Sequence, residues 1–331
     1  MKTKRKALVT GANGFIGYHL CRHLKDNDWE VIALIHSDRG KADLENLDVK
    51  IVNASVTDLD SMMAAVPAEV DAFFHLAGVT SQWYKDFNRQ FEVNVNGTRI
   101  ALDVASEKQA KRFVHISSIM AFGLHNERIT EKTESNAFEL NNNYSRTKLK
   151  AEKLAINAYR SGMDVVILNP SHIIGPKDRH NHIQLFEAIM DDNLPGIPPG
   201  KGMFCHVADA VLAFEQAALK GQSGEKYLIG GHCLSFKELS MGISKALGKK
   251  KNIRVIPKWA FKLLLPYYSF VGFLTNKEPL LTPGKVLISC ADIACDDSKA
   301  VRAFGLKYLS VDRMITDTLD WLTESRSITN Q

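Results

Sequence analysis

Tyr144 and Lys148 are the two residues best spaced for joint chemistry, in the stretch NYSRTKLKAEKL at 143–154. The stretch has the pattern of a charged helix, in which side chains four residues apart share one face. The phenol and the ammonium could therefore address the same small volume. Because the Tyr-x-x-x-Lys spacing is common by chance, a solvated helix face remains the alternative unless other motifs supply partners for the pair.

Such a pair suits proton transfer to or from a carbonyl oxygen. A free tyrosine has a pKa of about 10, and a cation about 5 Å away would stabilise its phenolate by about 3 kcal/mol, or about two pK units. Lys148 is therefore predicted to tune Tyr144 toward neutral pH. Tyr144 would give a proton when a ketone is reduced and take one when an alcohol is oxidised.

A glycine-rich segment, ALVTGANGFIGYHL, is the second candidate. Its glycines recur every three residues, directly after an apolar run and at the opening of a helical pattern. This spacing allows a tight turn and a close approach of the backbone to a pyrophosphate, which the positive end of the helix attracts. The segment predicts a dinucleotide site. Its predicted cofactor contacts are Gly11, Asn13, Gly14, Phe15, Ile16 and Gly17.

The end of the second predicted strand indicates which dinucleotide is preferred. NAD sites usually have an acid there, which binds the ribose 2′-hydroxyl. Here Ile35 and His36 take its place and Arg39 and Lys41 follow, although Asp38 lies between them. We predict NADP(H) rather than NAD(H), with the 2′-phosphate near His36, Arg39 and Lys41.

The elements that must position these residues follow from the apolar segments. Predicted strands lie at 6–10, 30–35, 49–53, 71–77, 112–117 and 164–169, with amphipathic segments between them. This alternation predicts an α/β fold whose parallel sheet is covered on both faces. Right-handed crossovers make the sheet doubly wound, as in a Rossmann fold.

After residue 170 the alternation breaks. A proline- and glycine-rich loop at 193–202 precedes one clear helix, HVADAVLAFEQAAL, and shorter mixed segments follow. We expect 1–170 to form the dinucleotide-binding domain, with 203–222 returning to it. Residues 171–331 would then form mainly a smaller C-terminal α/β lobe that binds the substrate.

The motifs in this order resemble the extended or atypical short-chain dehydrogenase/reductase family, part of the NAD-dependent epimerase/dehydratase superfamily. They are TGANGFIG, HLAG, VNVNGT, HISSIMAFG, the Tyr-x-x-x-Lys pair and LNPSHIIGP. The likeness runs from about Lys4 to Phe304 and is strongest to the branch of dihydroflavonol reductases and 3β-hydroxysteroid dehydrogenases. It implies NAD(P)-dependent hydride transfer between the cofactor and a ketone or secondary alcohol.

The resemblance implies further site residues. Ser118, counted back from Gly123, is the implied catalytic serine beside Tyr144 and Lys148. Ser55 stands where the family has an aspartate that meets adenine, and Asp209 is expected to cap a framework helix rather than to react. The other implied cofactor contacts are Val56, Leu76, Ala77, Gly78, Asn94, Tyr144, Lys148, Pro170 and Ile173.

Substrate contacts are harder to identify. Trp83 and Tyr84 follow the fourth predicted strand, at the carboxyl edge where such sheets bind ligands, although loop packing is an equal alternative. His172, next to a predicted nicotinamide contact, is a third candidate. Nucleotide-sugar members of the family often carry an arginine where this chain has GKGMF, and dehydratases have acids after the serine. We therefore expect a small, largely apolar substrate.

Two other functions remain open. A nucleotide-sugar epimerase could use the same scaffold, and a binding protein could sense NADP without turnover. The complete set of Ser118, Tyr144 and Lys148 disfavours the sensor. By resemblance, helices near 94–106 and 144–159 would pair two copies into a homodimer.

The composition of the chain limits the partners and metals that it is expected to bind. A net charge of +5, from 42 basic and 37 acidic residues, is small and scattered, so no nucleic-acid partner is expected. The five cysteines form no C-x-x-C pair and indicate a reduced, cytoplasmic protein. No metal is expected, because His180 and His182 lack acidic or cysteine partners at ligand spacing.

The most apolar stretch is WAFKLLLPYYSFVGFL at 259–274. It is too short to span a bilayer, and Lys262 and Pro266 interrupt it. We expect it to line a pocket or to join the core; contact with a membrane surface is the alternative.

Overall fold

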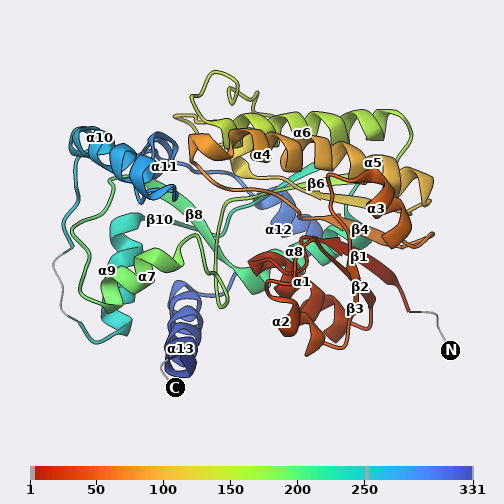
Figure 1. Cartoon of the computed structure of the whole chain (residues 1–331), viewed down its shortest axis with the longest axis horizontal. Helices are drawn as coiled ribbons and strands as arrows, with labels where there is room; N and C mark the ends of the chain where they lie inside the picture. Colours follow the sequence, from red (N-terminus) through yellow and green to blue (C-terminus); the bar gives the residue numbers. More distant parts are fainter. Residues whose placement is uncertain (1–3, 250–252, 330–331) are drawn as a thin grey trace.

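A computed structural model describes residues 4–249 and 253–329 of the chain (Figure 1). Its main sheet has seven strands in the order β3-β2-β1-β4-β5-β6-β9, and each neighbouring pair is parallel. The strands are β1 (Lys6–Thr10), β2 (Glu30–Ile35), β3 (Lys50–Asn53), β4 (Ala72–His75), β5 (Phe113–Ile116), β6 (Val165–Pro170) and β9 (Lys226–Ile229). The strand order reverses between β1 and β4, so the predicted doubly wound sheet is confirmed.

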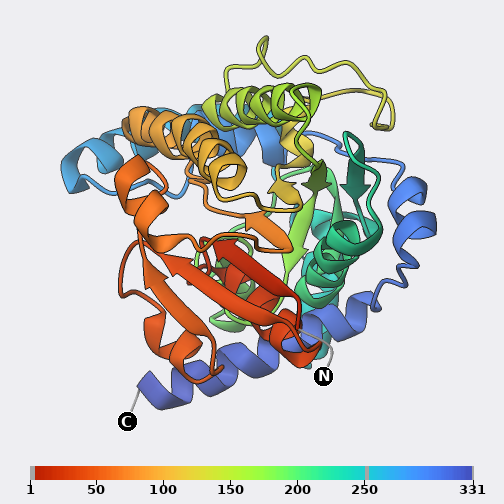
Figure 2. The ribbon, with the colours of Figure 1, turned by 90° about the vertical axis from the view of Figure 1, so that its right-hand side faces the viewer.

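Helices cover both faces of this sheet because its strands are apolar on both sides. Ala7 and Val9 of β1 pack in one buried cluster, whereas Leu8 between them packs in another. The first cluster is covered by α1 (Phe15–Asp26), α2 (Lys41–Glu45), α8 (Val207–Lys220) and α12 (Ser298–Phe304). The second is covered by α3 (Leu59–Ala65), α5 (Gly97–Glu107) and α6 (Asn143–Arg160), the last two side by side in Figure 2.

The segment between β4 and α5 is helical with an irregular turn. It contains η1 (Tyr84–Asp86), α4 (Phe87–Phe91) and the π-helical turn η2 (Glu92–Asn96), which runs directly into α5. After β5 comes the short 3₁₀ turn η3 (Ile119–Ala121). Both irregular segments lie at the carboxyl edge of the sheet, where they contribute to the site described below.

A smaller lobe, on the left of Figure 1, confirms the expected C-terminal α/β part of the fold. Its three-stranded sheet has the order β10-β8-β7, with β7 (His172–Ile174), β8 (Lys201–His206) and β10 (His232–Ser235). Its helices are α7 (Ile183–Met190), α9 (Phe236–Ala246), α10 (Lys258–Thr275), α11 (Pro283–Ser289) and α13 (Val311–Thr329). The second half of the chain also supplies β9, α8 and α12 to the larger layer.

Helix α10 contains the apolar stretch 259–274 and differs from the expectation. Only Phe261 and Gly272 of this helix are buried, whereas Trp259, Leu263 and Tyr267 expose 65%, 71% and 63% of their surface. The expected core or pocket-lining role is therefore wrong for most of its side chains, because the helix packs along one face only. Within the described ranges, no helix is long and apolar enough to cross a bilayer.

Candidate functional site

The structure brings Ser118, Tyr144 and Lys148 together at the carboxyl edge of the sheet. Ser118 lies two residues past the end of β5, where its side chain interacts with the buried phenol of Tyr144. The Lys148 ammonium lies 6.0 Å from the centre of the Tyr144 ring and donates to the Ile116 carbonyl at 3.0 Å. A hydroxyl pair and a buried cation thus share one small volume.

The start of α6 determines where Tyr144 lies. The Asn142 side chain accepts from the Ser145 amide at 2.9 Å and caps the helix. The Asn142 amide group also donates to Gln82 at 2.7 Å, which ties the helix start to the loop after β4. Tyr144 is therefore held in the first turn, one helical turn before Lys148.

Neighbouring serines 117 and 118 face different partners. The Ser117 hydroxyl donates to Glu152 at 2.7 Å, away from Tyr144. The Ser118 hydroxyl oxygen accepts from the Met120 amide at 3.2 Å, which leaves its proton available to another acceptor. The geometry thus favours Ser118, the serine implied by the motif, as the one that faces the site.

Burial governs the charges of the site. It lowers the pKa of Lys148 to about 8, against the opposing influence of Glu152. Burial raises the pKa of Tyr144, while the hydrogen bond from Ser118 acts in the opposite direction. The predicted lowering of the Tyr144 pKa by Lys148 is therefore not found, because desolvation is the larger effect and the ammonium is directed at the Ile116 carbonyl.

Glu152 is a member of this site that the sequence reading missed. Its carboxylate is buried and accepts from Ser117, Asn169 and Lys226. Its spacing could have indicated it, because 144, 148 and 152 follow each other at intervals of four on one helix face. The carboxylate stabilises the charged form of Lys148 from the side away from Tyr144.

His75 belongs to a hydrogen-bonded chain behind the site. The Thr10 hydroxyl oxygen accepts from the Leu76 and Ala77 amides, so its own proton goes to His75 Nδ1 at 3.0 Å. His75 Nε2 then donates to Thr98 at 3.1 Å. Burial lowers the His75 pKa to about 3, so this histidine is neutral and structural.

The glycine loop fits the pyrophosphate of a dinucleotide. Gly11 has φ +67°, and a Cβ at Gly17 would lie 2.2 Å from the Gly11 carbonyl oxygen. Gly14 begins α1 without a side-chain cap from the described residues, so the amides of the first turn remain available. The Ser171 hydroxyl, in the segment expected to pass the nicotinamide, is buried without a partner in the described part of the chain.

The loop after β2 lies beside this glycine turn. The Asn13 side chain donates to the carbonyls of Ser37 and Arg39 at 3.0 and 2.9 Å. The Arg39 guanidinium is 2.7 Å from His180, and His36 is exposed. Lys41 lies 3.8 Å from both Asp38, which precedes α2, and Glu45, within α2, so its charge is partly compensated by these neighbours.

The remaining predicted cofactor contacts line the carboxyl edge. A Cβ at Gly78 would lie 3.6 Å from the Lys148 ammonium, so the HLAG turn passes close to the catalytic candidates. Asn94, in η2, accepts from the Val79 amide at 2.7 Å and donates to Val79 and Thr147, which commits its amide group to the protein. Val56 packs on Gly97, and the Ser55 hydroxyl is 2.8 Å from that of Thr57. Pro170 ends β6, and Ile173 is buried in β7.

The three substrate candidates differ in their surroundings. Tyr84 is 59% exposed, and Trp83 is half-buried with the Lys85 ammonium 5.0 Å from its ring. His172 stacks on Phe204 at 4.7 Å between ring centres, within an aromatic cluster. Burial lowers the His172 pKa to about 3, so this ring is neutral.

Helix α8 begins differently from the expectation. The His206 ring, not Asp209, caps the helix by accepting from the Ala208 amide at 3.0 Å. Asp209 instead accepts from the Leu309 amide, 100 residues further along the chain. The expected N-cap role of Asp209 is wrong because α8 begins at Val207, which places Asp209 inside the first turn of the helix.

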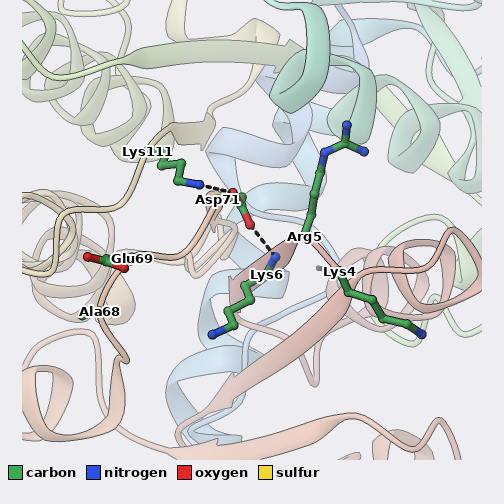
Figure 3. Close-up of a pocket in the computed structure, with 7 residues that line it drawn as sticks. All are labelled: Lys4, Arg5, Lys6, Ala68, Glu69, Asp71 and Lys111. Carbon is green, nitrogen blue, oxygen red and sulfur yellow. Dashed lines mark hydrogen bonds and ion pairs between the residues drawn. The ribbon is translucent and has the colours of Figure 1, made fainter. Parts of the chain in front are cut away.

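A separate depression lies at the opposite, amino edge of the sheet (Figure 3). It is lined by Lys4, Arg5, Lys6, Ala68, Glu69, Asp71 and Lys111. The Asp71 carboxylate accepts from the Lys6 amide at 2.8 Å and from Lys111 at 2.7 Å, so its charge is matched locally. This depression shares no residue with the site at the carboxyl edge.

Two further properties of the structure concern metal-ligating side chains and cysteines. In the part of the chain that it describes, no group of three or more histidine, cysteine or acidic side chains could hold a metal ion. Each of the five cysteines, all in described positions, is a free thiol.

Comparisons with known proteins agree with the fold and the motif order. Residues 7–230 match the family described as "NAD dependent epimerase/dehydratase family". A Synechocystis sp. protein provisionally named dihydroflavonol 4-reductase is 27% identical over 321 residues, which cover 95% of this chain and 93% of that protein. The Methylococcus capsulatus protein named sterol demethylase protein B is 28% identical over 323 residues, 96% of this chain and 98% of that protein.

A solved structure supports the architecture. The crystal structure of gox2253 superposes with a TM-score of 0.84 at 22% identity, covering 98% of this chain and 99% of that chain, which bears on the fold alone. The family match and the relatives confirm the predicted resemblance to the extended short-chain dehydrogenase/reductases.

Proposed function

Because this chain belongs to the NAD dependent epimerase/dehydratase family, we propose that it is an NADP(H)-dependent oxidoreductase that interconverts a small, largely apolar ketone and its secondary alcohol. The observation that carries the proposal is the convergence of the Ser118 and Tyr144 hydroxyls beside the buried ammonium of Lys148, which lies 6.0 Å from the centre of the Tyr144 ring. The names of the two relatives refer to a dihydroflavonol and a sterol, which supports an organic ring compound as substrate.

The residues that would hold the cofactor are those of the glycine loop and the carboxyl edge. Gly11, Gly14 and Gly17 would hold the pyrophosphate, and the Gly78 turn and Lys148 would lie beside the nicotinamide ribose. When bound, the nicotinamide ring gives a hydride to the carbonyl carbon or takes one from the alcohol. The chain itself supplies the proton and the polarisation of the oxygen.

Tyr144 is the proposed proton donor in reduction. Its raised pKa keeps the phenol protonated at neutral pH, so a proton is available for the carbonyl oxygen as negative charge develops there. The Ser118 hydroxyl, with its oxygen engaged by the Met120 amide, would donate a second hydrogen bond to the same oxygen. Lys148 would bind the hydroxyls of the nicotinamide ribose through its ammonium.

The pH dependence of the reaction tests this role of Lys148. Since burial lowers the Lys148 pKa to about 8, the ammonium is present below that pH and is lost above it. The kcat/KM for ketone reduction should therefore decline as the pH rises through about 8. In Lys148→Arg, whose guanidinium stays charged, any remaining activity should persist to about pH 10 or above.

A second variant distinguishes a change in the Lys148 pKa from a loss of folding, because only the former should shift the pH at which kcat/KM declines. Glu152→Gln removes the carboxylate that raises the Lys148 pKa, so the decline should move to lower pH. The measurement is kcat/KM against pH for the parent and both variants, with thermal melts as the check on folding. A decline at one and the same pH in all three proteins would contradict the role of Lys148.

The proposed preference for NADPH rests on Arg39 and on the absence of an acid at the end of β2. Arg39→Ala should raise the KM for NADPH by about 10- to 100-fold, the value of one charged hydrogen bond, and should leave the KM for NADH nearly unchanged. Arg302→Ala is the matched control, because Arg302 is exposed on α12, away from the glycine loop and from α5 and α6. A lower KM for NADH than for NADPH in the parent would overturn the preference.

An epimerase is the main alternative on this scaffold. The arginine expected for a nucleotide sugar would fall at Gly202 or Met203. A Cβ at Gly202 would lie 2.5 Å from the His172 ring, so a larger side chain is disfavoured there, and Met203 is buried. A panel of ketones and secondary alcohols with NADPH and NADH, beside UDP- and GDP-sugars, tests the proposal directly. Conversion of a sugar nucleotide without net change in reduced nicotinamide would identify an epimerase, and binding without any turnover would identify a sensor.

The proposal includes a homodimer formed through α5 and α6. These helices lie side by side on one outer face of the sheet (Figure 2). Light scattering of the purified protein measures the stoichiometry.

A further inference from the structure

Helix α10 presents a continuous apolar stripe to solvent. Trp259, Leu263, Tyr267, Phe270 and Leu274 recur every three or four residues and expose 60–71% of their surface. The helical period places all five on one face. The buried residues Phe261 and Gly272 lie on the other side of the helix, toward the protein. Single exposed apolar residues are ordinary, but a contiguous stripe of this kind marks an interaction surface.

The surroundings of the stripe are strongly basic. Between Glu238 and Glu278 the sequence contains no acidic residue, but it contains eight lysines and arginines. In the structure Arg254, Lys258, Lys262 and Lys277 are exposed, and none of these four has a carboxylate partner among the described residues. Aromatic and aliphatic side chains flanked by cations match the boundary of an anionic bilayer, where the rings lie at headgroup depth and the cations meet phosphates.

We infer that α10 lies in the plane of an anionic lipid bilayer and docks the protein on the membrane surface. A second copy of the chain fits this surface less well, because a symmetric pairing of the stripes would bring the two basic surrounds together without acids between them. The helix does not need to span the bilayer, since an in-plane helix buries only its apolar face.

The carboxyl end of α10 is connected to the candidate active site. The Lys85 ammonium donates to Asn276 at 2.8 Å and lies 5.8 Å from the centre of the Phe273 ring. Ser81, in the same loop, donates to Glu278 at 3.1 Å. The next residue, Gln82, accepts from the Asn142 side chain that caps the helix of Tyr144. A docked α10 would therefore hold the loop that carries the substrate candidates Trp83 and Tyr84 at the membrane surface. Delivery of an apolar substrate by this route rests on the proposed function.

Flotation of the full chain with vesicles tests the docking. We expect the protein to float with phosphatidylcholine vesicles that contain about 30% phosphatidylglycerol, because a negative surface attracts each nearby basic residue, and to float poorly with phosphatidylcholine alone. Leu263→Ser/Phe270→Ser should lower the partition coefficient by about 10- to 100-fold, because two apolar side chains no longer enter the bilayer. Lys258→Glu/Lys262→Glu should abolish the preference for anionic vesicles.

Leu59→Ser/Met241→Ser is the matched control, because both side chains are exposed and apolar but lie on α3 and α9. It should float like the parent, and thermal melts should show all variants folded. Absence of parent flotation, or equal flotation of Leu263→Ser/Phe270→Ser, would overturn the inference. The inference would also be overturned if light scattering detected a dimer that these two substitutions dissociate and if the parent did not float with vesicles. Flotation requires no turnover, so its failure is distinguishable from a failure of the ketone-reductase proposal.

Discussion

Tyr144→Phe should lower kcat for ketone reduction by about 10²- to 10⁴-fold, the usual contribution of a positioned proton donor. The substitution removes the phenolic hydroxyl that meets Ser118 and leaves the ring in place. The Kd for NADPH should change by less than about tenfold, because at most one neutral hydrogen bond is lost. Steady-state kinetics and calorimetric titration with NADPH measure the two quantities.

Tyr159→Phe provides the control on the same helix. Tyr159 lies near the end of α6 and is 42% exposed, remote from Ser118. This variant should keep the parent kcat. Equal turnover by Tyr144→Phe and the parent would remove Tyr144 from the mechanism.

Gly17→Ala should weaken NADPH binding by about 10²-fold or more. A Cβ at this position would lie 2.2 Å from the Gly11 carbonyl oxygen and 2.8 Å from the Ala12 Cα. Both neighbours are backbone, so the turn that would hold the pyrophosphate must shift, and a displacement of about 1 Å costs about 10²-fold at such a site. Overpacking should also reduce the free energy of unfolding by about 1–3 kcal/mol.

Two further glycine variants make this prediction specific. At Gly14 the Cβ would lie 3.2 Å from the same oxygen, so Gly14→Ala should weaken NADPH binding less than Gly17→Ala. Gly162 has φ +100° and nothing within 4 Å, so Gly162→Ala should cost about 1–2 kcal/mol of stability and leave the Kd unchanged. Calorimetric titration and denaturant melts give both values, and an unaltered Kd in Gly17→Ala would show that the cofactor does not use this turn.

The local, periodic part of the molecule could be predicted from sequence. The strands expected at 6–10 and 30–35 have these bounds in β1 and β2, because short apolar runs between turn residues leave little choice of structure. The meeting of Ser118 with Tyr144 could also be predicted, since the ends of neighbouring parallel strands share one edge of the sheet. The direction of the Tyr144 pKa could not, because it depends on how much water the folded site excludes.

Features that depend on distant partners were beyond the sequence. The spacing of four residues places Glu152 on the helix face of Tyr144 and Lys148, but its burial could not be predicted, because its partners Asn169 and Lys226 come from β6 and β9. The hydropathy of α10 showed that the segment is apolar but not which surface covers it. The cap of α8 by His206 could likewise not be predicted, because Asp209 accepts from the amide of Leu309, which lies 100 residues further along the chain.

The place of β9 at the edge of the main sheet has a consequence for biosynthesis. While the nascent chain leaves the ribosome, β6 is complete before β9 has been translated, so the outer side of β6 stays bare for that interval. An unpaired, apolar strand edge is a template for association with other chains. A fragment cut after residue 170 would carry this bare edge permanently and should aggregate, whereas a fragment that extends past Ile229 can close it.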